Sequence, residues 1–169
     1  EDLMIGTGYI SYPWVSVFAS PVYGNIGGYG GADAIIYCAA ADIACTYIGH
    51  SLAKGEDFDG DGLSDILVGD KHRHTYGSEA GGAYLFPGGF LGSDMGSDEA
   101  HLILEGEHEG DKAGYAVSIA GDIDGDGLQD LLIGAPFESS VADTSGAMYL
   151  ITDYTPGQLE LTDATAKLV

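Results

Sequence analysis

Two loops of alternating carboxylates are the residues of this sequence best suited to do chemistry. Each loop has Asp at its first, third, fifth and ninth positions and Gly at its fourth and sixth. Alternate side chains of a tight loop converge on one point, and the glycines allow the positive-φ turns that such wrapping requires. The seventh residue offers its backbone carbonyl. The candidate metal ligands are Asp57, Asp59, Asp61, Leu63 and Asp65 in the first loop, and Asp122, Asp124, Asp126, Leu128 and Asp130 in the second.

The chemistry of these ligands favours calcium. All are hard oxygen atoms, about five per loop, and Mg²⁺ would demand a smaller and more rigid octahedron. No cysteine or histidine lies in the loops, which disfavours zinc. A solvated turn is the alternative, but four unneutralised carboxylates within nine residues would repel one another. An EF-hand needs an acidic twelfth residue, where this chain has Val68 and Ile133. We therefore expect two Ca²⁺ sites.

The loops lie inside an internal repeat. Residues 49–69 align with 114–134 at an offset of 65, and the match resumes at an offset of 64 between 82–86 and 146–150. A truncated third copy is recognisable at 2–6 and 31–37. The repeat divides the chain into a partial first unit at 1–48, a second unit at 49–105 and a third unit at 106–169.

Each full repeat predicts four short strands. We expect strands at 115–120, 131–133 and 147–151, with the fourth represented by 101–104 in the earlier copy. The acidic loop then joins the first two strands. The predicted fold class is all-β, with four-stranded antiparallel blades of the β-propeller type. At 65 residues per repeat the chain holds about 2.6 blades, whereas propellers need about 4–8. The chain is therefore part of a longer protein or one subunit of an assembly.

The order of these motifs resembles the FG-GAP repeat, best known from the propeller of integrin α chains. It is carried by the Gly-Tyr-Ala-Val-Ser stretch at 114–118, the acidic loops, the Gly-Ala-Pro at 134–136 and the Gly-Ala-Met-Tyr at 146–149. The resemblance covers 49–169 well and 1–48 partly. It implies that the ten loop residues bind calcium in an extracellular or cell-surface module for adhesion or assembly. The usual aromatic-Gly start is replaced by Ile48-Gly49 and Ala113-Gly114.

Composition excludes several other functions. The chain has 27 acidic and 5 basic residues, a formal net charge of −22. This charge repels nucleic acid phosphates and anionic membrane surfaces. No apolar stretch approaches 18 residues, so we expect no membrane insertion. The motifs contain no evident nucleophile, general base or open metal position, so we expect no enzymatic activity. A protein partner or further copies of the chain are the expected partners.

The variable loops between the second and third strands are the expected recognition surface, because loops on a repeated scaffold carry binding residues. The first of them, at 7–30, contains Tyr12, Trp14 and Tyr23, which could stack on a glycan, grip a protein, or pack the insertion against its blade. The second contains Arg73, which could bind an anion or form a salt bridge with the acidic surface. A lectin-like binder of carbohydrate or protein is therefore the alternative function.

Cys38 and Cys45 are the two cysteines of the chain. They lie on the two sides of a possible hairpin that turns near Ala41 and Asp42, which would place the sulfurs roughly opposite each other. A disulfide is geometrically possible there, and two buried thiols are the alternative.

Overall fold

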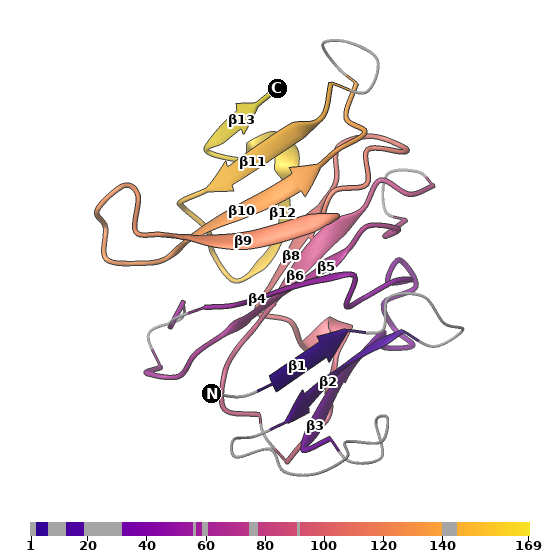
Figure 1. Cartoon of the computed structure of the whole chain (residues 1–169), viewed down its shortest axis with the longest axis vertical. Helices are drawn as coiled ribbons and strands as arrows, with labels where there is room; N and C mark the ends of the chain where they lie inside the picture. The colour runs from indigo at the N-terminus through magenta and orange to yellow at the C-terminus, as the bar shows by residue number, and fades with distance from the viewer. Residues whose placement is uncertain are drawn as a thin grey trace.

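The computed structural model describes residues 3–6, 13–18, 32–55, 57–58, 61–74, 78–90, 92–139 and 145–169. Within these ranges the chain is all-β, with strands β1 to β13 and two three-residue 3-10 helices, η2 (Ser97–Glu99) and η3 (Leu161–Asp163). Neither helix is long enough to cross a membrane. The strands form three sheets that follow one another along the long axis of the molecule (Figure 1).

The second and third sheets have the predicted blade topology. Strands of the second sheet are β4 (Ser51–Lys54), β5 (Ile66–Asp70), β6 (Gly82–Phe86) and β8 (Leu102–Glu105), each antiparallel to the next. The third sheet contains β9 (Ala116–Gly121), β10 (Asp130–Ala135), β11 (Ala147–Ile151) and β13 (Ala166–Leu168). A fifth strand, β12 (Gly157–Glu160), adds in parallel to β8. The third sequence unit therefore contributes a strand to the second sheet, which the repeat boundaries did not predict.

The first sheet corrects two expectations. It contains β1 (Leu3–Gly6), β2 (Trp14–Phe18), β3 (Ala34–Tyr37) and β7 (Met95–Gly96) in that order. The segment 14–18, expected to be part of a long loop, is a strand between β1 and β3. The segment 31–37 resembles the Gly-Ala stretch of the third strand in the later repeats, which predicts a third strand there. Since β7 pairs in parallel with β3 as β12 does with β8, β3 instead occupies the fourth-strand position. The residues Trp-Val-Ser-Val-Phe at 14–18 are mostly aromatic or β-branched and favour a strand, so the sequence did carry a signal for β2.

The structural repeat keeps an offset of 65 where the sequence alignment slipped to 64. Gly81 and Gly146 have φ values of +80° and +74°, and their amides donate to the carbonyls of Arg73 and Glu138. These two glycines are therefore equivalent, and Tyr84 of the second sheet is equivalent to Tyr149 of the third. The predicted match of 82–86 with 146–150 is wrong by one residue, because the Gly-Ala at 82–83 matches the Gly-Ala at 146–147 although Gly81 is the structural counterpart of Gly146.

Close backbone contacts dock each sheet on the next. A Cβ added to Gly6 would lie 2.0 Å from the carbonyl oxygen of Gly49, and one added to Gly69 would lie 2.1 Å from that of Gly114. Only glycine permits this approach. At the equivalent Gly134 the nearest atom is 3.4 Å away and belongs to Ala116 of the same sheet. The outer face of the third sheet thus carries the docking glycine without a further sheet against it.

The side chains on the docking faces also differ in burial between the second and third sheets. Ala83 and Leu104 are cross-strand neighbours in the second sheet and are fully buried in the core between the second and third sheets. Their counterparts Met148 and Leu168 are neighbours in the third sheet and are 40% and 54% exposed. An apolar sheet face that is covered in one blade is therefore open in the next.

The expected hairpin between the cysteines is also corrected. Residues 38–50 contain turns and bends and no strand, and two successive turns are closed by hydrogen bonds from Asp42 N to Ala39 O and from Cys45 N to Asp42 O. The chain nevertheless folds back, and Cys38 and Cys45 form a disulfide with a Cα–Cα distance of 5.4 Å.

Candidate metal centres

The acidic loop of the third sheet lies between β9 and β10 and is described completely. Oxygen atoms of Asp122, Asp124 and Asp130 lie within 4.8 Å of one another. The two oxygens of Asp122 accept hydrogen bonds from the amides of Gly125 (2.7 Å) and Gly127 (3.0 Å). Both glycines have positive φ, +83° and +93°. The glycines at the fourth and sixth positions therefore wrap the loop around its own first carboxylate.

Asp130 provides the test of whether this loop fits a cation. It is fully buried at the start of β10. Its Oδ2 accepts the amide of Ile123, but its Oδ1 is buried and has no hydrogen-bond partner among the described residues. A buried carboxylate oxygen without a partner carries a large desolvation cost. A Ca²⁺ ion held by Asp122, Asp124 and Asp130 would offset this cost, and the donor set of hard oxygens suits that ion.

The loop of the second sheet repeats this arrangement where it is described. Asp59 lies outside the described residues. Asp57 accepts hydrogen bonds from the amides of Asp61 (2.9 Å) and Gly62 (2.7 Å). The nearly fully buried Asp65 accepts the amide of Phe58 at 2.7 Å, as Asp130 does that of Ile123. The remaining candidate ligands, Asp61, Asp126, Leu63 and Leu128, lie in the exposed turns of the two loops.

The two loops differ at one point that the sequence did not reveal. Oδ1 of Asp65 accepts the amide of Gly88 at 2.6 Å, just after β6. The equivalent residue after β11 is Asp153, whose carboxylate lies with those of Asp124 and Asp126, within 4.8 Å. Comparison of the repeats could not find Asp153, since its counterpart is a glycine. The signal that the sequence offered was the position of Asp153, an acidic residue two residues after the strand predicted at 147–151.

Arg73 occupies a buried network. It is 4% exposed, donates to both oxygens of Glu105 (2.8 and 2.6 Å) and to Asp42 (2.9 Å), and contacts the hydroxyl of Tyr84. Burial opposes ionisation of Asp42, but Arg73 and the Tyr84 hydroxyl lower the pKa of that carboxyl below its usual value. Gln158 of β12 also donates to Glu105. Of the two roles considered for Arg73, the structure shows the salt bridge.

The equivalent position of the third sheet carries the opposite charge. Glu138 takes the place of Arg73 and is fully buried. Lys167 supplies the cation from β13, pairing with Glu138 (3.1 Å) and with Glu107. Glu107 accepts a hydrogen bond from the hydroxyl of Tyr149 at 2.9 Å, as Asp42 does from Tyr84. Burial and the Glu107 carboxylate raise the pKa of Tyr149 above its ordinary value. Both sites are structural networks that hold the blade together.

Of the three aromatic residues expected to bind a ligand, the structure describes only Trp14. Trp14 begins β2, opposite Tyr37, and its side chain is partly buried. The expectation that it stands in a binding loop is therefore wrong. Tyr12 and Tyr23 lie outside the described residues.

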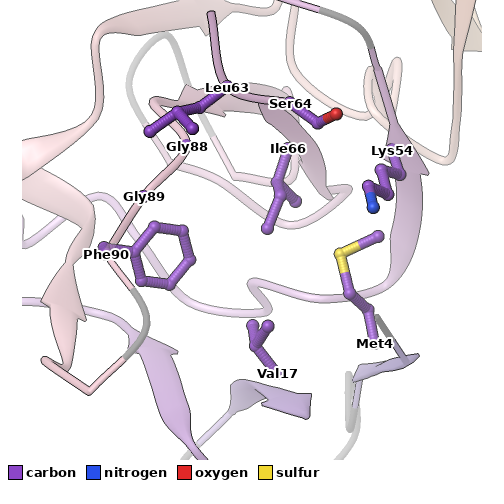
Figure 2. Close-up of a pocket in the computed structure, with 9 residues that line it drawn as sticks. All are labelled: Met4, Val17, Lys54, Leu63, Ser64, Ile66, Gly88, Gly89 and Phe90. Carbon is purple, nitrogen blue, oxygen red and sulfur yellow. The ribbon is translucent and has the colours of Figure 1, made fainter. Parts of the chain in front are cut away.

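A pocket of about 210 Å³ lies between the first and second sheets, beside the acidic loop of the second (Figure 2). Met4 and Val17 line it from the first sheet, and Ile66 lines it from β5. Leu63, whose carbonyl is a candidate ligand, also contributes its side chain to the wall. Two residues of the acidic loop, Leu63 and Ser64, therefore line the pocket between these two sheets.

Successive four-stranded sheets docked through glycines, with an acidic loop between the first two strands, define a protein built from β-propeller-type blades. Residues 48–86 and 113–151 match the model of the FG-GAP repeat, and the chain therefore carries two FG-GAP repeats.

Three similar proteins illustrate its relationships. Integrin alpha-5 of Xenopus laevis is 30% identical over 81% of this chain and 12% of its own length. Integrin alpha-3 of Mus musculus is 36% identical over 54% of this chain and 8% of its own length. Phosphatidylinositol-glycan-specific phospholipase D of Bos taurus is 38% identical over 68% of this chain and 14% of its own length. The chain thus spans only a small part of each relative.

Proposed function

We propose that this chain is a non-enzymatic, calcium-binding repeat module of the cell surface or extracellular space, used for adhesion or structural assembly. The observation that carries the calcium claim is Oδ1 of Asp130. This buried carboxylate oxygen has no hydrogen-bond partner in the part of the chain that the structure describes, and Asp130 lies with Asp122 and Asp124. Ca²⁺ would be held by the carboxylates of the two acidic loops, with Leu63 and Leu128 offering backbone carbonyls.

The bound ion supplies positive charge where the chain has little. The formal net charge is −22, and eight of the 27 acidic residues stand in the two loops. Neutralisation of these carboxylates lets the connection between the first two strands of each blade close. Because the converging oxygens come together only in the folded chain, binding free energy becomes folding free energy.

The location and the lack of catalysis rest on separate observations. The disulfide between Cys38 and Cys45 fits an oxidising compartment. Two of the similar proteins are integrin alpha chains. The similarity to a phospholipase D covers 14% of that protein, so its activity is not carried over to this chain. The lectin alternative loses Trp14 as a loop residue, because Trp14 stands in β2.

Calorimetric titration tests the calcium proposal directly. Wild-type chain is expected to bind two Ca²⁺ ions, and Asp61→Asn or Asp124→Asn should each remove one, because each substitution removes a carboxylate from one loop. The matched control is Glu109→Gln, which removes one exposed charge from the turn at 107–110, outside both loops. Wild-type chain that takes up no calcium would overturn the proposal, as would full binding by the doubly substituted chain.

We propose the outer face of the third sheet as the assembly surface, for a protein partner or another copy of the chain. Its support is the exposure of Met148 and Leu168 where Ala83 and Leu104 are buried in the second sheet. Exposed apolar area of this kind favours association. Light scattering is expected to show concentration-dependent association that Met148→Glu abolishes. A monomer at every concentration would refute self-association and leave a protein partner, or a further blade of a longer protein, as the occupant.

A further inference from the structure

The two acidic loops meet at the segment that follows β11. Asp153 lies with Asp124 and Asp126 of the third-sheet loop, within 4.8 Å between carboxylate oxygens. The next residue, Tyr154, turns to the other loop: its hydroxyl donates to the carbonyl of Phe58 at 3.1 Å, and the two rings lie 6.4 Å apart. Adjacent residues therefore contact both candidate metal centres.

Asp130 supplies an independent reason to expect a ligand in the third-sheet loop. In the second sheet the amide of Gly88 donates to Oδ1 of Asp65. In the third sheet the residue equivalent to Gly88 is Asp153, and the buried Oδ1 of Asp130 has no hydrogen-bond partner among the described residues. The third sheet therefore shows no counterpart of the Gly88 hydrogen bond, and it carries one carboxylate more. A cation held by Asp122, Asp124 and Asp130 would bind the orphaned oxygen, and Asp153 would add its carboxylate beside Asp124.

Phe58, in the second-sheet loop, is fixed in position by burial and by a backbone hydrogen bond. Its side chain is 2% exposed and belongs to the core between the second and third sheets, with Ile119 of β9 packed against that core. Its amide donates to Oδ2 of Asp65 at 2.7 Å. Phe58 also stands directly between the candidate ligands Asp57 and Asp59. A shift of Tyr154 therefore reaches the carboxylates of the second-sheet loop through one hydrogen-bonded residue.

We propose that Asp153 and Tyr154 couple the two metal centres: Asp153 completes the carboxylate set of the third-sheet loop, and Tyr154 transmits occupancy of that loop to the loop of the second sheet. This inference rests on the proposed calcium function. Such coupling is reciprocal, so calcium in either loop strengthens binding in the other.

Calorimetric titration of the full chain with Ca²⁺ measures the coupling. Asp124→Asn leaves only the second-sheet loop able to bind Ca²⁺, and Asp61→Asn leaves only the third-sheet loop. The product of the dissociation constants measured in these two variants is the value expected for two sites that do not influence each other. The wild-type product is expected to be about fivefold smaller, at the low end of measured couplings. Tyr154→Phe keeps the ring but removes the hydroxyl, and should bring the ratio to one. In the Asp61→Asn background, Asp153→Asn should weaken the remaining site about tenfold, because carboxylate number sets affinity.

Two control variants match these changes. Tyr115→Phe removes a hydroxyl from a tyrosine that is 43% exposed, and Glu109→Gln removes one exposed charge. Neither should alter the constants. Two bound ions with a product ratio of one in wild-type chain overturn the coupling and leave the calcium function standing. Persistence of the fivefold ratio in Tyr154→Phe overturns the role of Tyr154, and an unchanged constant in Asp153→Asn overturns that of Asp153. A wild-type chain that binds no calcium overturns both proposals.

Discussion

Removal of Ca²⁺ with a chelator is expected to lower the midpoint of thermal unfolding by about 10–20 °C. A ligand present at 100 times its dissociation constant stabilises the native state by about 2.7 kcal/mol, so two sites contribute about 5 kcal/mol. A chain of this size loses about 2–4 °C for each kcal/mol. Part of the effect arises because chelation leaves buried Asp65 and Asp130 facing a loop of like charges. Circular dichroism, recorded with calcium and with chelator, measures the shift.

The variant carrying both Asp61→Asn and Asp124→Asn provides the control for this experiment. Its melting temperature should be the same with calcium as with chelator, because both loops have lost a ligand. The Glu109→Gln variant should respond to chelator as wild-type chain does. A melting temperature of wild-type chain that ignores calcium would contradict a structural role for the ions, even if calorimetry found them bound.

Replacement of Arg73 by Met is expected to destabilise the chain by about 3–5 kcal/mol. Removal of one partner of a buried ion pair leaves uncompensated charge in a medium of low polarity. Arg73 is 4% exposed and lies between Asp42 and Glu105, and Glu105 itself is 1% exposed. Tyr84 would lose a further polar contact. Urea unfolding at neutral pH, followed by fluorescence, measures the change in the free energy of unfolding.

Two further variants make this prediction specific. Lys71→Met removes a cation that lies 5.1 Å from the ring of Tyr115, on the partly exposed surface, and should cost less than about 1 kcal/mol. Adding Glu105→Gln to Arg73→Met should recover part of the loss, because it removes one of the unpaired carboxylates. A loss below 1 kcal/mol in Arg73→Met would show that the network is hydrated in solution.

Local spacing made the blades and their loops predictable. The four strands expected for a full repeat occur within two residues of their predicted bounds, and each acidic loop joins the first and second strands. These features depend on residues close together in the chain, where alternation and glycine placement restrict the backbone directly. The strand at 14–18 was missed although its residues favour a strand, because the repeat comparison assigned the whole of 7–30 to a variable loop.

The all-β class, the repeat and the sets of carboxylates that converge within each loop follow from local patterns in the sequence. Contacts between residues far apart in the chain follow from the tertiary structure. Tyr154 reaches Phe58 across 96 residues, Arg73 reaches Glu105 across 32, and Asp153 joins a loop that ends 23 residues earlier. A nine-residue loop brings its own side chains together by its backbone turns. The contacts of Arg73 and Asp153 also need the strands of one blade to pair in register, and the contact of Tyr154 needs the second and third sheets to dock through glycines such as Gly69. Docking depends on shape over an entire face, which no single motif encodes.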